Sequence, residues 1–167
     1  SLNKLAMHCG VASVFYKDES QRLNMKSFKA LGGAYAVANL VAKQIIMGVN
    51  PENITVTTAT DGNHGRSVAW GAQQAGCRAE IYIHEHVSEQ RADAMSIFGA
   101  KVNRIKGNYE ASLAACKADA DANNWHIVSD TSWTGYREIP CDIMAGYSVM
   151  GREAWEQLGS TRPTHCF

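Results

Sequence analysis

The sequence predicts an α/β fold, a parallel twisted sheet with helices on both faces. Short β-rich runs alternate with longer amphipathic helical patterns along residues 54–158, the order that right-handed βαβ units produce. The chain has 167 residues and is 46% hydrophobic, enough for a real core and about one domain. No internal repeat or low-complexity segment argues for another class of architecture.

The first expected elements are a strand and a long helix. Residues 12–17 are rich in β-prone side chains, so a strand is predicted there. From Ser27 to about Met47 the apolar side chains recur on one helical face, and Gly48 ends that helix. The later elements are then expected, in order, as strand 54–58, a helix ending at Gly76, strand 79–84, a helix between Ser88 and Gly99, strand 102–105, a helix over 109–120 capped by Asn108, strand 126–129, and a last helix with Pro140 near its first turn.

Composition excludes several classes of function. Sixteen basic residues balance sixteen acidic ones without a long run of either sign, which argues against nucleic acid or an anionic membrane surface as a partner. No apolar stretch approaches the length of a membrane span, and no signal segment is seen. The five cysteines are scattered and odd in number, so we expect a reducing, cytoplasmic location and no structural zinc.

A lysine stands at the start of the long helix, in the run Ser27-Phe28-Lys29-Ala30-Leu31-Gly32-Gly33. Lys29 differs from an ordinary surface lysine such as Lys26, because apolar neighbours flank it and the two glycines let another segment approach closely. The helix dipole disfavours an ammonium there and favours a neutral or imine nitrogen. Lys29 is therefore predicted to do Schiff-base chemistry.

Polar residues follow two of the expected strands. Asp61, Gly62, Asn63 and His64 come after one strand, and Asp130 comes after another. Ligands gather at the carboxyl ends of strands in open α/β sheets, so both groups are expected on one rim. Free amides at the next helix start would bind a carboxylate. Taken alone, an Asp-Gly-Asn turn is more often only a turn, and His64 is more simply a turn residue than an acid.

No metal site is predicted. His84-Glu85-His86 places two imidazoles on one strand face, but no third ligand stands out, and a polar strand end is the simpler interpretation. The four tryptophans lack a basic groove and are expected to be packing residues.

Three motifs carry a family resemblance: Lys17-Asp18-Glu19-Ser20, the run at residues 27–33, and Thr60-Asp61-Gly62-Asn63-His64-Gly65. In this order they resemble the tryptophan-synthase-like (fold type II) enzymes that use pyridoxal 5′-phosphate, and nearly the whole chain fits. Asp61 stands where that superfamily usually has a small residue. Together with Asp130 in Ser129-Asp130-Thr131-Ser132-Trp133, it resembles the diaminopropionate ammonia-lyases within the superfamily.

The resemblance implies a set of site residues. Lys29 would hold the cofactor as a Schiff base, with Phe28 packed beside it and Asn63 bonded to the cofactor's 3′-oxygen. Lys29, Asp61 and Asp130 would be catalytic. The substrate would contact Asp61, Gly62, Asn63, His64 and Asp130. The two carboxylates suit the extra ammonium of 2,3-diaminopropionate, and crowding between them is expected to raise the pKa of one.

The resemblance also implies an organisation and an activity. Residues 1–47 would begin a larger domain, residues 52–158 would form a smaller α/β domain, and residues 163–167 would begin a strand that returns to the larger one. The implied reaction is β-elimination of ammonia from an amino-acid substrate, giving pyruvate, by a homodimer. The expected phosphate-binding glycine loop is not in the sequence, so this chain is interpreted as an internal piece that is inactive alone. Two alternatives stay open: a serine or threonine dehydratase, and a cofactor-free α/β binding module.

Overall fold

The computed structural model describes all residues from Ser1 to Phe167 and confirms the predicted fold class. Four strands form one sheet in the order β3-β2-β1-β4, and every neighbouring pair is parallel. The strands are β1 (Thr55–Ala59), β2 (Arg78–His84), β3 (Lys101–Ile105) and β4 (His126–Ile127). Val56 of β1 pairs with Ala79 on one side and with His126 on the other. The carboxyl ends of β1 and β4 are therefore neighbours, which places the segments that follow them on one rim.

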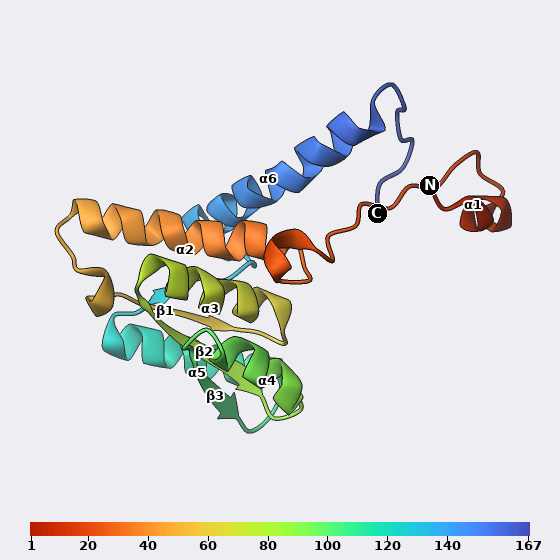
Figure 1. Cartoon of the computed structure of the whole chain (residues 1–167). Coiled ribbons are helices and arrows are strands. Elements are labelled where there is room, and N and C mark those ends of the chain that lie inside the picture. Colours follow the sequence, from red (N-terminus) through yellow and green to blue (C-terminus); the bar gives the residue numbers. More distant parts are fainter.

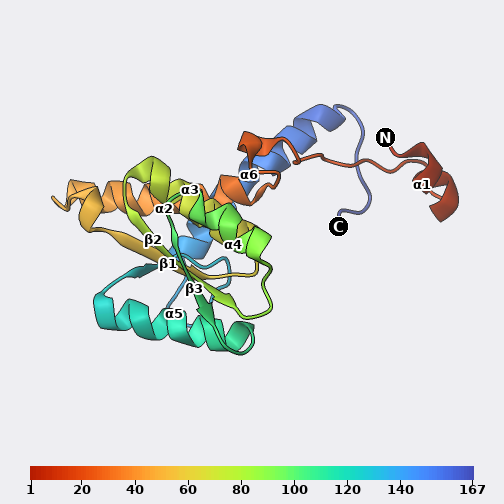
Figure 2. The ribbon, with the colours of Figure 1, turned by 60° about the horizontal axis from the view of Figure 1, so that its bottom comes forward.

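Six α-helices surround this sheet. They are α1 (Asn3–Cys9), α2 (Lys29–Ile46), α3 (Asn63–Ala75), α4 (Glu89–Ser96), α5 (Tyr109–Asn123) and α6 (Glu138–Leu158). Helix α5 covers one face of the sheet, and α3 and α4 cover the other, with α2 packed over α3 (Figure 2). Helix α6 crosses behind α2 and extends away from the sheet, and α1 lies beyond it near the N-terminus (Figure 1). None of these helices combines the length and apolar character that a membrane crossing requires.

The main core lies between the sheet and the layer of α2, α3 and α4. Its fully buried members include Val37, Val56, Val68 and Ile81, which come from two helices and two strands. A smaller cluster of Ala59, Tyr82 and Cys116 sits under α5 on the opposite face. Buried β-branched side chains suit the strands, which are covered on both faces.

Glycines let α6 and α3 pack closely against α2, as the sequence predicts for Gly32 and Gly33. A Cβ atom at Gly32 would stand 2.4 Å from the ring of Tyr147 on α6. A Cβ atom at Gly33 would stand 2.1 Å from the hydroxyl oxygen of Ser67 on α3. That hydroxyl donates to the backbone oxygen of Lys29 at 2.8 Å. The two glycines therefore fix the start of α2 between two other helices.

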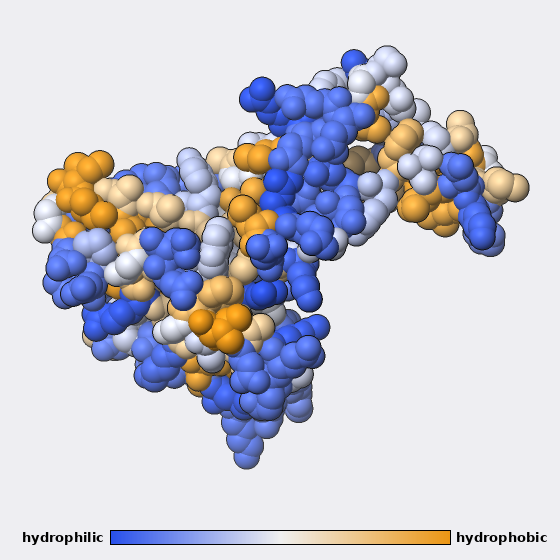
Figure 3. Space-filling model, viewed as in Figure 1, coloured by the Kyte–Doolittle hydropathy of each residue, from blue (hydrophilic) through white to orange (hydrophobic).

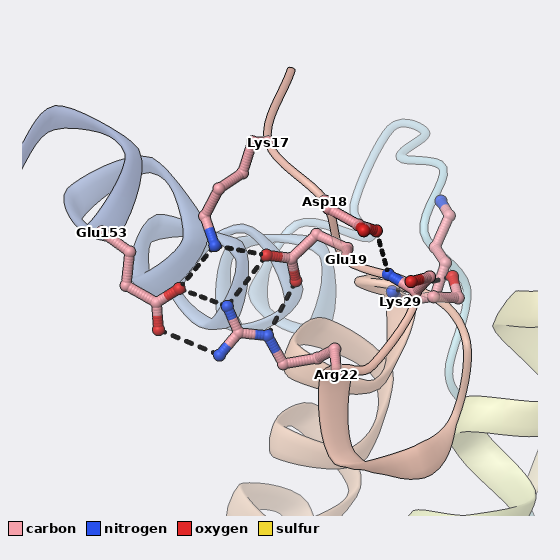
Figure 4. Close-up of polar contacts among 8 residues, drawn as sticks. Lys17, Asp18, Glu19, Arg22, Lys29 and Glu153 are labelled. Atoms are coloured by element: carbon pink, nitrogen blue, oxygen red, sulfur yellow. Dashed lines mark hydrogen bonds and ion pairs between the residues drawn. The ribbon is translucent and has the colours of Figure 1, made fainter. Parts of the chain in front are cut away.

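An ion-pair cluster holds the segment before α2 against α6 (Figure 4). Lys17 contacts Glu19 at 2.8 Å and Glu153 of α6 at 2.9 Å, and Arg22 pairs with both carboxylates. Glu19 is buried. Its ion pairs with Lys17 and Arg22 compensate for the burial of its charge. The Lys-Asp-Glu-Ser motif thus has a structural role near the lysine that follows it.

The helix boundaries agree closely with the predictions. Asn108 caps α5, and its side-chain oxygen accepts from the backbone N–H of Ala111 at 3.0 Å. Gly76 and Gly99 follow the ends of α3 and α4 with positive φ angles, which glycine adopts at least cost. Pro140 is the third residue of α6, where its missing N–H breaks no helical hydrogen bond.

Three predicted strands differ from the structure. Residues 12–17 and 163–167 form no strand, and the strand expected at 126–129 covers only His126 and Ile127. Side-chain propensity favours extended backbone, but a strand also needs a neighbour whose peptide groups it can bond. No strand lies beside residues 12–17 or 163–167, and Phe15, Tyr16 and Phe167 are exposed. Apolar surface accordingly shows around the N-terminal segment (Figure 3).

Candidate active site

The predicted lysine and one predicted carboxylate meet directly. Lys29 is the first residue of α2, and its backbone N–H donates to the Ser27 hydroxyl at 3.2 Å. Its Nζ lies 2.7 Å from Oδ2 of Asp130, in the segment that follows β4. The two side chains are 29% and 27% exposed, so the pair is partly desolvated but reachable from solvent. Residues 101 positions apart in the chain are thus joined at one rim.

Each member of this pair shifts the pKa of the other. Burial alone would lower the pKa of Lys29, but its hydrogen bond to Asp130 and the charge of that carboxylate outweigh burial and raise it. The prediction that the helix dipole favours a neutral amine is therefore wrong for this state. A carboxylate within hydrogen-bond distance acts more strongly on the ammonium than the partial charge at a helix end.

The predicted rise in a carboxylate pKa is likewise wrong for Asp130. Burial alone would raise the pKa of Asp130, but the His64 imidazole and the Lys29 ammonium outweigh it and lower it. His64 contributes only when protonated, and burial lowers its own pKa. Lys29 therefore supplies the main attraction near pH 7, and Asp130 is an ionised carboxylate that accepts hydrogen bonds.

Two aromatic rings flank the lysine. Nζ of Lys29 lies 5.5 Å from the centroid of Phe28 and 5.5 Å from the centroid of Tyr147. The rings meet edge to face with their centroids 5.0 Å apart. These distances are within the range of cation–π attraction, about 6 Å. Phe28 thus packs beside the amine, and Tyr147, which was expected only as an apolar position of the last helix, does so too.

Tyr136 holds the segment that carries Asp130. Its hydroxyl donates to the backbone oxygen of Ile127 at 2.9 Å and accepts from the backbone N–H of Ser129 at 2.8 Å. Its ring stacks on Trp133 with centroids 4.0 Å apart. Burial raises the pKa of Tyr136 to about 12, so the phenol stays protonated and makes both bonds. Tyr136 therefore holds the backbone on the N-terminal side of Asp130 in place.

The Asp61-Gly62-Asn63 turn links β1 to α3 as predicted. The Thr60 hydroxyl accepts from the N–H groups of Gly62 and Gly65, both at 3.1 Å. The N–H groups of Asn63 and His64 make no hydrogen bond, so two amides at the start of α3 are free. A helix start with free amides attracts anionic groups. A cavity of about 390 Å³ opens beside this turn, whereas a larger apolar cavity of about 580 Å³ lies away from it between α2, α3 and α6.

Asp61 and Asp130 lie on the same rim, but each carboxylate has a different ion-pair partner. Asp61 is 59% exposed on its side chain, and its Oδ1 lies 3.2 Å from Nε2 of His84 on β2. Burial raises the pKa of Tyr109, and the charges of Asp130 and Asp61 raise it further. That phenol, at the start of α5, is therefore near both carboxylates. Tyr109, like Tyr136 and Tyr147, was missed as a site residue.

His64 is more than a turn residue. It is buried, and its Nε2 is 2.8 Å from the backbone oxygen of Val128, so Nε2 carries the proton and donates. Nδ1 lies 3.7 Å from Oδ2 of Asp130 and has no hydrogen-bond partner. Tyr147 and His64 each place a polar group on the apolar face of a helix. Because buried polar atoms require partners, this is the one sequence signal that could have identified them as site residues.

The chain contains no group of three or more His, Cys, Asp or Glu side chains arranged to hold a metal ion. His84 and His86 have ring centroids 5.8 Å apart and meet edge to face, and His84 is engaged with Asp61. The chemistry of this rim therefore centres on an amine, carboxylates and amides.

A family model described as a pyridoxal-phosphate dependent enzyme matches residues 1–167. The chain therefore belongs to the pyridoxal-phosphate dependent enzymes, which confirms the family resemblance seen in the motifs. Diaminopropionate ammonia-lyase from Escherichia coli (strain K12) is 38% identical over 178 residues, covering 99% of this chain and 45% of that protein. The crystal structure of the apo form of the Escherichia coli enzyme matches with a TM-score of 0.91 and 40% identity, covering 98% of this chain and 47% of that one.

A more distant relative is a biosynthetic L-threonine dehydratase from Lactococcus lactis, 27% identical over 116 residues that cover 68% of this chain and 26% of that protein. The chain spans less than half the length of the ammonia-lyases that it matches. It therefore accounts for only part of the residues that such proteins contain.

The residues present fit the family's cofactor. Lys29 provides a primary amine of the kind that condenses with an aldehyde, and Asn63 provides an amide side chain at the exposed start of α3. Nδ1 of His64 and the hydroxyl of Tyr147 are buried and lack partners, and both belong to residues that contact the Lys29–Asp130 pair. This arrangement is suited to a small polar molecule that completes the rim.

Proposed function

We propose that this chain carries the reactive-lysine part of a pyridoxal-phosphate dependent ammonia-lyase that converts 2,3-diaminopropionate to pyruvate and ammonia. The contact of 2.7 Å between Nζ of Lys29 and Asp130, beside the free start of α3, is the observation that carries the proposal. The similarity to diaminopropionate ammonia-lyases over 99% of the chain supports the choice of substrate.

The proposal assigns the cofactor to three residues. Lys29 would hold it through its side-chain nitrogen, Phe28 would pack beside it, and the side chain of Asn63 would hydrogen-bond to it. When bound, the cofactor supplies an electron sink for negative charge at the substrate's α-carbon. The protein's own contribution is to place its amine, amide and carboxylate groups around that carbon.

Charge complementarity supports the assignment of the substrate groups. The free N–H groups of Asn63 and His64 suit the α-carboxylate. Asp130 and Asp61 suit the second ammonium, which serine and threonine lack. Asp130 is an ionised carboxylate near pH 7, because the Lys29 ammonium helps to lower its pKa against the effect of burial. Selection for a diamino acid would follow from these two carboxylates.

Proton transfer completes the proposal. The α C–H bond breaks and its proton passes to a base, Asp61 for one enantiomer and Lys29 for the other. The bond from the β-carbon to nitrogen then breaks, the electron pair stays on nitrogen, and protonation releases ammonia. The remaining 2-aminoacrylate takes up water and loses its one remaining nitrogen as ammonia, which leaves pyruvate. The exposed position of Asp61 beside His84 is compatible with proton exchange with solvent.

Replacement of Lys29 tests the proposal. In a protein that spans the length of the ammonia-lyases, Lys29→Ala is expected to abolish both pyruvate formation and the borohydride-reducible adduct with pyridoxal 5′-phosphate. Lys26→Ala is the matched control, because Lys26 is exposed and three positions away, and it should retain both. An adduct that survives in Lys29→Ala would show that another lysine holds the cofactor.

Two other functions have distinct outcomes in the same assays. A serine or threonine dehydratase would prefer serine or threonine to 2,3-diaminopropionate and would be indifferent to Asp61→Ala. The threonine dehydratase relative makes this the nearer alternative. A cofactor-free binding module would stay colourless when pyridoxal 5′-phosphate is added.

We also propose a cytoplasmic location and a homodimer for the whole protein. All five cysteines are free, which suits a reducing compartment. Exposed apolar side chains on α2 and α6, among them Ile46 and Met144, offer surface for further protein contacts. Sedimentation of the protein that spans its relatives' length would give the oligomeric state.

A further inference from the structure

Unpartnered polar atoms gather around the lysine. Three buried side-chain nitrogen or oxygen atoms lack a hydrogen-bond partner, namely Nδ1 of His64, Nε of Arg66 and the hydroxyl of Tyr147. His64 and Tyr147 both adjoin the Lys29–Asp130 pair. Buried polar groups without partners are rare in folded proteins and often have a functional reason. Nothing in the proposed function uses Tyr147.

Tyr147 has a fixed position in the fold. Its ring lies over Gly32 of α2, where a Cβ atom would come within 2.4 Å of it. The preceding residue, Gly146, holds α6 so close to α2 that a Cβ atom there would come within 2.0 Å of the backbone oxygen of Leu31. The edge-to-face contact with Phe28 restrains the ring from another side. Close packing against the backbone of α2 thus fixes the position of the phenol.

Three groups surround the ε-nitrogen of Lys29. Asp130 lies 2.7 Å away, and the rings of Phe28 and Tyr147 have their centroids at 5.5 Å. His64 is the other titratable side chain whose charge couples to Lys29. Asp130 accepts hydrogen bonds from only part of the ammonium, which carries three donors. A phenol oxygen beside the ammonium is a suitable second acceptor.

We propose that Tyr147 is a positioning residue for Lys29, with its ring holding the ε-nitrogen against Asp130 and its hydroxyl accepting a second hydrogen bond from the ammonium. The proposal rests on the proposed function only in taking Lys29 as the reactive amine. Burial raises the pKa of Tyr147 although the charge of Lys29 opposes this, so the phenol is protonated and keeps its oxygen free to accept.

Competitive acetylation of lysines with acetic anhydride tests this without any cofactor, because only the neutral amine reacts. The yield at Lys29 would be measured by peptide mass spectrometry from pH 6 to pH 11, relative to exposed Lys101. In Tyr147→Phe the neutral amine is expected at lower pH, with at least threefold faster acetylation of Lys29 at pH 8. Tyr35→Phe on α2 is the matched control, since Tyr35 is 48% exposed and should leave the profile unchanged.

Asp130→Asn calibrates the response and is expected to shift the same profile in the same direction. A Tyr147→Phe profile that superimposes on the wild-type profile overturns the proposal, whether or not Asp130→Asn shifts it. Should Tyr147→Phe fail to fold, Phe28→Leu serves instead, because it removes the ring that restrains Tyr147. An unshifted profile in Phe28→Leu would also overturn the proposal. A failure of the proposed function would show separately, as a cofactor adduct that survives in Lys29→Ala.

Discussion

Replacing Gly146 by alanine should destabilise the packing of α6 against α2, the two helices that carry Tyr147 and Lys29. A Cβ atom there would lie 2.0 Å from the backbone oxygen and 2.7 Å from the carbonyl carbon of Leu31, and 2.9 Å from Cα of Gly32. All three neighbours are backbone atoms of α2, which cannot rotate away. Overpacking of this kind costs about 1–3 kcal/mol, and a clash with backbone belongs at the upper end. Alanine recovers about 1 kcal/mol through its helix propensity, so the net loss is about 2 kcal/mol.

Gly151→Ala is the matched control on the same helix. Gly151 is exposed and has no atom within 4 Å of the position its Cβ would take. The same substitution should therefore stabilise the chain there by about 1 kcal/mol. For a chain of this size each kcal/mol moves the melting temperature by about 2–4 °C. Gly146→Ala should melt about 4–8 °C below the wild type, and Gly151→Ala about 2–4 °C above it.

Thermal and urea unfolding followed by circular dichroism would measure both variants. If Gly146→Ala unfolded at the same midpoint as Gly151→Ala, the close packing of α6 on α2 would be refuted. The position of Tyr147 beside Lys29 would be refuted with it, because Gly146 and Tyr147 are adjacent on α6. If Gly146→Ala unfolded at the wild-type midpoint, α6 would be able to move away from α2 at little cost in free energy, and the contact between the helices would be loose.

Two further changes test how neighbouring segments are held. Tyr136→Phe should cost about 1–2 kcal/mol of unfolding free energy, because the backbone N–H of Ser129 loses its acceptor; unchanged urea unfolding would contradict this. Hydrogen bonds to Arg22 and then Lys17 lower the pKa of Glu153 from 4.5 to about 2, so its stabilising contribution is complete above pH 4.5 and is lost as the pH falls toward 2. Pepsin should therefore cut residues 12–17 readily in Glu153→Gln at pH 5, and in the wild type only at lower pH. Equal cleavage rates of the two proteins at pH 5 would argue against the ion pairs of Glu153 with Arg22 and Lys17.

The alternation of elements could be predicted because it depends on local patterns. Helical periodicity placed α2, and turn residues such as Gly76 and Asn108 marked helix ends within a residue or two. Residues 12–17 show the limit of such patterns. Their side chains favour extended backbone, yet a strand depends on a partner elsewhere in the chain. Sequence composition carries no information on whether that partner is present.

The sequence could predict that Lys29 and Asp130 belong to one site, but it could not predict how their charges act on each other. Neighbouring strands β1 and β4 bring Asp130 to the same rim as the turn at Asp61, as the rule for parallel sheets requires. The pKa of Lys29 depends on a side-chain conformation that joins two distant segments, and no local pattern encodes a distance of 2.7 Å. Tyr147 escaped notice for a related reason. Its phenol is set by glycines on another helix, so its role arises from packing between α2 and α6.

Under the proposed function, the ion pair between Lys29 and Asp130 would contribute to the selection of a diamino substrate. An ionised carboxylate in a partly buried place is costly unless a cation compensates it. Lys29 provides that cation here. When Lys29 no longer offers its ammonium to Asp130, the second ammonium of 2,3-diaminopropionate would take its place as the cation. Serine brings only a hydroxyl, which leaves the carboxylate's charge uncompensated.

Asp130→Asn should therefore narrow the preference for the diamino acid over serine, because an amide has no charge that requires a cation. A preference that stays as large in Asp130→Asn would mean that Asp61 or another group makes the selection.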